Sequence, residues 1–166
     1  MLQPVRRRTW APRGQTPLLY AWDRHDRISA ISAITVSPRR RKLGMYFHLQ
    51  EENVRAEHLV RFVRDLHRQL GTPLIVVWDR SGPHRKAARL LQQRSPRWLR
   101  IEWLPAYAPD LNPTEQCWNH SKYSDMANYI PADTAHLRRA IKKSFSKQRK
   151  NDSLLHSYFQ TAQLRL

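Results

Sequence analysis

The stretch LIVVWD, residues 74–79, consists of five apolar residues followed by a carboxylate. A short apolar run without alternation is typical of a strand inside a sheet, covered on both faces. Because ligands of open α/β sheets bind at the carboxyl ends of strands, Asp79 is predicted to stand at a functional edge. Glu115 follows Asp79 by 36 positions, after the turn YAPDLNPT of residues 107–114. Two carboxylates delivered in this way indicate a site that holds divalent metal against phosphate.

The charge of the chain indicates the matching substrate. Lys and Arg number 30 against 13 Asp and Glu, which gives a formal net charge of +17. Such a surface attracts polyanions, above all nucleic acid. Charge alone leaves simple adhesion and catalysis equally open, so it indicates the partner and not the chemistry.

The length of 166 residues and the 40% hydrophobic content predict one domain, residues 1–166, with a real core. Cys117 has no second cysteine with which to form an intrachain disulfide. No run approaches about 18 apolar residues, so we expect no membrane span, and the start of the chain lacks a secretory signal. These features predict a cytoplasmic protein.

Strands are expected on the amino-terminal side of residues 74–79. Residues 18–22, 28–36 and 43–50 have strand composition and predict antiparallel pairing. Asn53 is the predicted N-cap of an amphipathic helix that Gly71 ends. A short helix beginning at Pro83 and a strand over 99–103 complete a predicted right-handed parallel crossover.

Helices are expected on the carboxyl-terminal side. Asn112 and Pro113 have the pattern of an N-cap and first helical residue, and open a helix that continues to about Met126. A second helix is predicted over 134–147, and the tail, 153–166, has the pattern of a short third one. The tryptophans at these and other positions are expected in the core, namely Trp10, Trp98, Trp103 and Trp118.

Three stretches of sequence carry a family resemblance. They are RTWAPRGQTP (residues 8–17), VWDRSGPH (77–84) and LPAYAPDLNPTE (104–115). Together with the predicted order of strands and helices, they resemble the DDE endonuclease domain of mariner-like bacterial insertion-sequence transposases. The resemblance covers nearly the whole chain and implies an α/β, RNase H-like mixed sheet flanked by helices.

The resemblance implies an enzyme that cleaves DNA and transfers strands during transposition, with three carboxylates holding two Mg²⁺ or Mn²⁺ ions. The second family acid corresponds to Asp79 and the third to Glu115. The first belongs on the central strand of the sheet, upstream of residue 8, and falls before Met1. We therefore expect an N-terminally truncated or frameshifted transposase that lacks this strand and the helix-turn-helix region. Such a chain is expected to be inactive alone and to form homo-oligomers or pair with an upstream fragment.

Other roles for the acidic residues remain open. Asp23 and Asp26 lie in a predicted turn at the wrong end of their strand to replace the missing acid. Asp110 is better placed, but organising its turn is the more ordinary role. Glu115 is also three positions after Asn112, where a capping-box acid would bond back to the N-cap amide.

Candidate DNA contacts come from basic residues and one histidine: Arg13, His84, Lys122, Arg138, Arg139 and Lys142. His84 has the alternative of a polar surface group in the first turn of its helix. The rival function is a non-catalytic DNA-binding fragment that regulates or inhibits transposase, which requires charge but no carboxylates. Either function implies a bacterial protein associated with the nucleoid.

Overall fold

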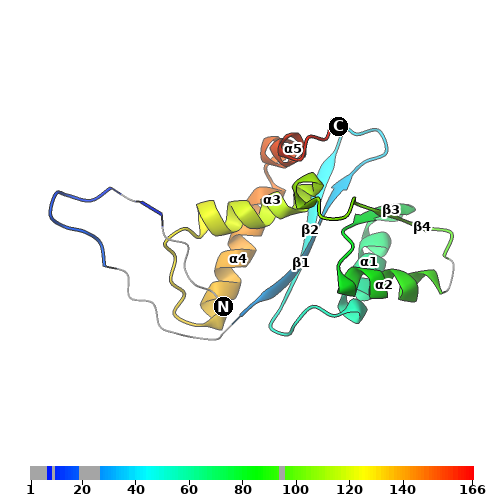
Figure 1. Cartoon of the computed structure of the whole chain (residues 1–166), viewed down its shortest axis with the longest axis horizontal. Coiled ribbons are helices and arrows are strands. Elements are labelled where there is room, and N and C mark those ends of the chain that lie inside the picture. Colours follow the sequence, from blue (N-terminus) through cyan, green and yellow to red (C-terminus); the bar gives the residue numbers. More distant parts are fainter. Residues whose placement is uncertain (1–6, 9, 19–26, 94–95) are drawn as a thin grey trace.

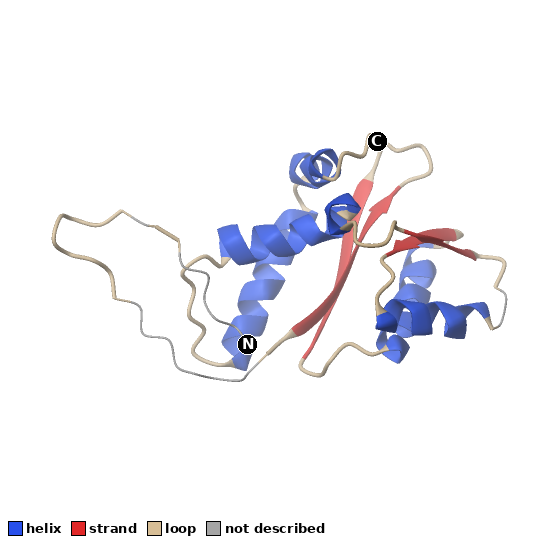
Figure 2. Cartoon of the chain, viewed as in Figure 1, coloured by secondary structure: helices blue, strands red, loops and turns tan. Residues whose placement is uncertain are grey.

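The computed structural model describes residues 7–8, 10–18, 27–93 and 96–166. It combines short strands with helices in an α/β arrangement (Figures 1 and 2). The elements follow the order β1 (Ser29–Val36), β2 (Leu43–Gln50), α1 (Ala56–Leu70), β3 (Leu74–Trp78), α2 (Gly82–Gln92), β4 (Leu99–Trp103), the 3-10 turn η1 (Pro109–Leu111), α3 (Pro113–His120), the π-helical turn η2 (Ser121–Asp125), α4 (Thr134–Arg149) and α5 (Asp152–Thr161).

The strands form two pairs. β1 and β2 are antiparallel, with Ser29 opposite Gln50, and β3 and β4 are parallel, with Leu74 opposite Leu99. The two pairs are separate two-stranded sheets within the described ranges. The predicted parallel connection through α2 is confirmed. The predicted strand 18–22 lies outside the described residues except for Leu18, which is exposed and not in a strand.

Helix α1 begins later than the sequence predicts. Its N-cap is Arg55 and not Asn53, because the ring of His58 accepts the Arg55 backbone N–H at 3.2 Å. Its end is as predicted: Gly71 has φ 64°, a left-handed conformation that glycine adopts without steric cost. Leu59 and Val63 are buried on the predicted apolar face.

Two apolar clusters lie on either side of the β1–β2 hairpin (Figure 1). In one, Ile31 of β1 packs against Leu59 and Val63 of α1 and against residues of α2, β3 and β4. In the other, Met45 and Leu49 of β2 pack against residues of α3, α4 and α5. The hairpin therefore joins two cores, with α1 and α2 on one side and α3 to α5 on the other.

Strand β3 is covered on one face only, contrary to prediction. Leu74, Val76 and Trp78 pack on the α1–α2 cluster, whereas Ile75 is 68% and Val77 56% exposed. The sequence does not distinguish the covered face from the exposed face, because both faces of β3 carry apolar side chains. The described part of the chain therefore leaves apolar sheet surface open to solvent.

The tryptophan prediction holds in part. Trp98 and Trp118 are half-buried and pack against the two clusters. Trp10 is wholly exposed and Trp103 is 37% exposed, so the prediction of core positions is wrong for these two.

A buried polar network joins the three carboxyl-terminal helices. The fully buried Gln148 of α4 donates from Nε2 to Ser121 Oγ at 2.7 Å and to Ser144 Oγ at 3.1 Å. Its Oε1 accepts from the Tyr158 hydroxyl of α5 at 2.9 Å. Ser121 opens the π-helical turn that continues α3 to Asp125, close to the predicted end at Met126. This network fixes α3 relative to α4 and α5.

In the portion of the chain that is described, no helix is both long and apolar enough to cross a membrane.

We expect Gln148→Met to destabilise the protein although the volume of the side chain is nearly kept. The change leaves the buried Tyr158 hydroxyl without its acceptor, which costs about 1–3 kcal/mol. Urea unfolding followed by circular dichroism measures the free energy of unfolding. The matched control, Gln69→Met on the exposed face of α1, should change it by less than about 0.5 kcal/mol. Equal losses in both variants would show that the network contributes nothing.

Candidate active site

Asp79 leaves the sheet directly after β3. The ladder continues to the end of the strand, since the Leu104 N–H donates to the Trp78 carbonyl at 2.8 Å. The Asp79 side chain is 45% exposed at this edge. The predicted position at the carboxyl end of a parallel strand is confirmed.

Two donors hold one oxygen of the Asp79 carboxylate. Oδ1 accepts the backbone N–H of Ser81 at 2.9 Å and faces Nδ1 of His84 at 2.5 Å. The His84 ring stacks on Trp78, with centroids 5.0 Å apart and planes 9° apart. Burial raises the pKa of Asp79, but the hydrogen bonds from Ser81 and His84 outweigh it, so the pKa lies below its ordinary value. Asp79 is thus a charged, oriented carboxylate.

Glu115 lies in the first turn of α3. The predicted cap is confirmed, because Asn112 Oδ1 accepts the Thr114 N–H at 3.1 Å and Pro113 is the first helical residue. The half-buried Glu115 carboxylate makes no hydrogen bond or ion pair within the described ranges, so the alternative capping-box role is not observed. Burial raises the pKa of Glu115, and the negative charge of Asp79 raises it further. The structure therefore brings the two carboxylates near enough to repel each other.

The pair has the chemistry of a divalent cation site. Both groups offer hard oxygen donors, and a cation between them would relieve their repulsion. Among the residues that the structure describes, no group of three or more His, Cys, Asp or Glu side chains is arranged to hold a metal ion. Asp110 is exposed in η1, and Asp23 and Asp26 lie outside the described residues.

His84 lies in the first turn of α2, as predicted, but it is not a free surface group. Its side chain is 24% exposed and is directed to Asp79. Sequence reasoning also missed Arg80, whose Nε donates to the Leu104 carbonyl at 3.2 Å and fixes the segment after β3. The sequence did contain a signal for the contact between His84 and Asp79. An acid at the end of a strand is followed, five positions later, by a histidine in the first turn of the next helix.

The predicted basic contacts are spread over separate elements. Arg13 is exposed in the amino-terminal segment, and Lys122 lies in η2 with its ammonium 5.3 Å from the Tyr123 ring centroid. Arg138 donates to the Leu49 carbonyl at 3.0 Å, which ties it to β2, whereas Arg139 and Lys142 are exposed on α4. Of the predicted DNA contacts, only His84 is in contact with either carboxylate.

Comparison with known proteins shows the family and the fold of the chain. The model of the DDE superfamily endonuclease family matches residues 1–138. A chain in the crystal structure of the Mos1 strand transfer complex is similar, with 18% identity and a TM-score of 0.60. The alignment covers 96% of the present chain and 46% of that chain, so the present chain spans about half of its length. No curated protein matches the chain.

The structural likeness confirms the predicted RNase H-like fold. The family match extends over both carboxylates and over most of the chain. The chain therefore belongs to the DDE superfamily of endonucleases.

Proposed function

We propose that the chain is a transposase catalytic region in which Asp79 and Glu115 bind divalent metal for DNA cleavage and strand transfer. The observation that carries this proposal is the pair of neighbouring carboxylates, of which one raises the pKa of the other. The family, the net charge of +17 and the likeness to the Mos1 complex support DNA as the substrate.

Each residue of the site has a distinct task in this proposal. Bound Mg²⁺ or Mn²⁺ supplies activation of a water or 3'-hydroxyl and stabilisation of the leaving oxygen. Ser81 and His84 hold Oδ1 of Asp79, which leaves Oδ2 for the cation. Trp78 keeps the His84 ring in place by stacking. Glu115, half-buried and without a hydrogen-bond partner among the described residues, would supply the second carboxylate to the cation.

We further propose that a third carboxylate arrives on an additional strand. β1 and β3 each have a ladder partner on one side only within the described ranges, and Ile75 and Val77 expose apolar surface beside them. Open edges of this kind favour pairing with another strand. That strand would come from an upstream segment of a longer parent protein or from a separate upstream fragment. In this proposal the protein is encoded by a bacterial insertion sequence and is associated with the nucleoid.

The second candidate is a non-catalytic DNA-binding fragment that regulates or inhibits transposase. The observation that favours it is the presence of two carboxylates, and no third beside them, in the part of the chain that the structure describes. It requires the net charge of +17 and no metal.

We expect Mn²⁺ to raise the thermal unfolding midpoint through Asp79 and Glu115. At ten times its Kd the ion stabilises the folded state by about 1.4 kcal/mol, which corresponds to about 4 °C. Asp79→Asn and Glu115→Gln should each remove the shift, whereas Glu51→Gln, an exposed acid elsewhere, should keep it. An undiminished shift in Asp79→Asn would place the ion elsewhere.

Asp79→Asn should lower the pKa of Glu115. In the wild type, burial and the Asp79 charge both raise this pKa, and the substitution removes only the charge. The pKa should fall towards the ordinary glutamate value but remain above it, as measured by a carbon-13 NMR titration of the Glu115 carboxyl. Asp110→Asn, a nearby acid that does not perturb Glu115, should leave the titration unchanged. A Glu115 titration that ignores Asp79→Asn would show that the carboxylates are not neighbours.

The purified chain should bind duplex DNA but neither nick nor join it in Mg²⁺ or Mn²⁺. Binding should weaken with salt, because basic residues displace counterions, and should persist in Asp79→Asn. Nicking of supercoiled plasmid measures cleavage. Supplying the proposed additional strand, with its carboxylate, should restore metal-dependent nicking in the wild type and not in Asp79→Asn. Failure of that restoration would favour the non-catalytic candidate, and nicking by the chain alone would contradict the need for a third carboxylate.

A further inference from the structure

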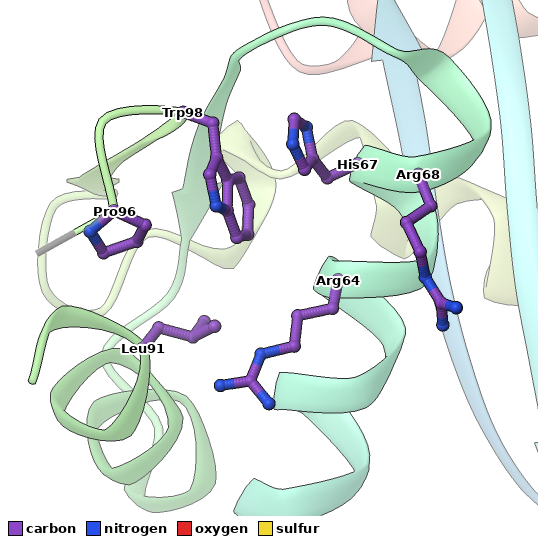
Figure 3. A pocket seen from close by; sticks show the side chains of 6 residues that line it. All are labelled: Arg64, His67, Arg68, Leu91, Pro96 and Trp98. Carbon is purple, nitrogen blue, oxygen red and sulfur yellow. The ribbon is translucent and has the colours of Figure 1, made fainter. Parts of the chain in front are cut away.

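A hollow of about 360 Å³ opens at the end of the β3–β4 sheet opposite the carboxylates. It lies where the Leu74 N–H donates to the Trp98 carbonyl at 2.7 Å, at the start of β3, whereas Asp79 follows the end of β3. The five residues of that strand span about 16 Å. The lining comes from α1, α2 and the segment before β4, namely Arg64, His67, Arg68, Leu91, Pro96 and Trp98 (Figure 3). The proposed cleavage uses none of these residues.

The aromatic wall of the hollow is held in place. The His67 and Trp98 rings stack with centroids 4.1 Å apart and planes 4° apart. His67 Nδ1 lies 2.9 Å from the Thr72 carbonyl and donates to it, which fixes the imidazole. Figure 3 shows Trp98 between His67 and Pro96, with Leu91 below Trp98 on the side of Arg64. One face of the indole is thus taken by His67, while the side towards Pro96 borders the hollow.

The two guanidinium groups at this wall differ in their ion pairing with described residues. Arg64 reaches from α1 towards Leu91 (Figure 3) and forms no ion pair with any described residue. Arg68 is different, because it pairs with Asp65 and its guanidinium is directed away from Trp98. The hollow therefore combines an apolar, aromatic wall with a guanidinium that has no ion pair among the described residues. This combination fits a planar ring joined to an anion.

We infer that the hollow binds one unpaired nucleotide of a DNA strand, with its base against Trp98 and Pro96 and its phosphate on Arg64. The inference rests on the proposed function for DNA as the partner. A phosphate alone would gain nothing from the apolar walls. A paired base is already stacked between its neighbours in the duplex and could not enter the hollow. Stacking of a base on an aromatic side chain is tolerant of sequence, because every base has a π-face.

The distance from the carboxylates assigns a role to this nucleotide. About 16 Å corresponds to roughly five nucleotides of stacked strand at 3.4 Å each. The bound nucleotide would therefore lie outside the cleaved bond, and the hollow would hold the strand in register while Asp79 and Glu115 act on it.

Fluorescence anisotropy with the 166-residue chain tests the inference. The probes are a labelled thymidine oligonucleotide of about 12 nucleotides, the same strand with abasic sites, and a duplex of equal length, all at one salt concentration. Trp98→Leu should weaken binding of the thymidine strand about tenfold, and Arg64→Gln about threefold or more. Trp98→Phe keeps a ring and should stay within about twofold. The matched charge control, Arg61→Gln on the exposed face of α1, should also stay within about twofold.

The pattern across the probes decides the outcome. The effect of Trp98→Leu should vanish on the abasic strand and be below about twofold on the duplex. Equal losses on all three probes, or an Arg64→Gln loss no greater than that of Arg61→Gln, would overturn the inference. The Mn²⁺-dependent shift in unfolding midpoint is measured in the same variants. If this shift persists but the base-dependent effect is absent, the nucleotide site is refuted and the metal site is not. If the shift is absent from the wild type, the proposed metal site is refuted instead.

Discussion

The parallel ladder between β3 and β4 determines where both candidate sites lie. Hydrogen bonds close it at each end, from Leu74 to Trp98 at 2.7 Å and from Leu104 to Trp78 at 2.8 Å. A slip of one residue would turn every side chain of the strand to the opposite face and would move Asp79 away from Glu115. The register is held by α1 and α2, which bury one face of the pair and leave the carboxyl end open for Asp79.

The second carboxylate depends on a different core. Glu115 is carried by α3, which packs on the β1–β2 hairpin through a cluster that includes Cys117 and Phe145. The Gln148 network fixes the end of this helix at Ser121. Two cores on opposite sides of one hairpin thus bring two like charges together. The repulsion between the two carboxylates disfavours the state in which both are ionised, but the packing of the two cores keeps them close. Active sites commonly lose some stability in this way for the sake of function.

Much of the fold follows from local signals in the sequence. The period of α1, the glycine that ends it, and the Asn112–Pro113 start of α3 each rest on a short-range physical cause, and each is observed. The same holds for Asp79, because an acid directly after an apolar strand must lie at the carboxyl end of that strand. The start of α1 was missed because it depends on the ring of His58 and not on the strength of Asn53 as a cap.

Features that depend on distant partners could not be predicted. The exposure of Ile75 and Val77 is set by what covers the sheet, and their apolarity alone gives no information about that. The contact of His84 with Asp79 requires the turn between β3 and α2, which folds the histidine back. Arg138 donates to the Leu49 carbonyl of β2, a contact 89 positions away that its charge alone does not indicate.

The most direct test of the account is an anomalous difference map from crystals of the chain soaked in Mn²⁺. The account predicts a peak between the carboxylates of Asp79 and Glu115, with Oδ2 of Asp79 as one ligand, and no such peak in Asp79→Asn. A map without density there, or with manganese only at other acidic side chains, would contradict the claim that these two carboxylates form a metal site.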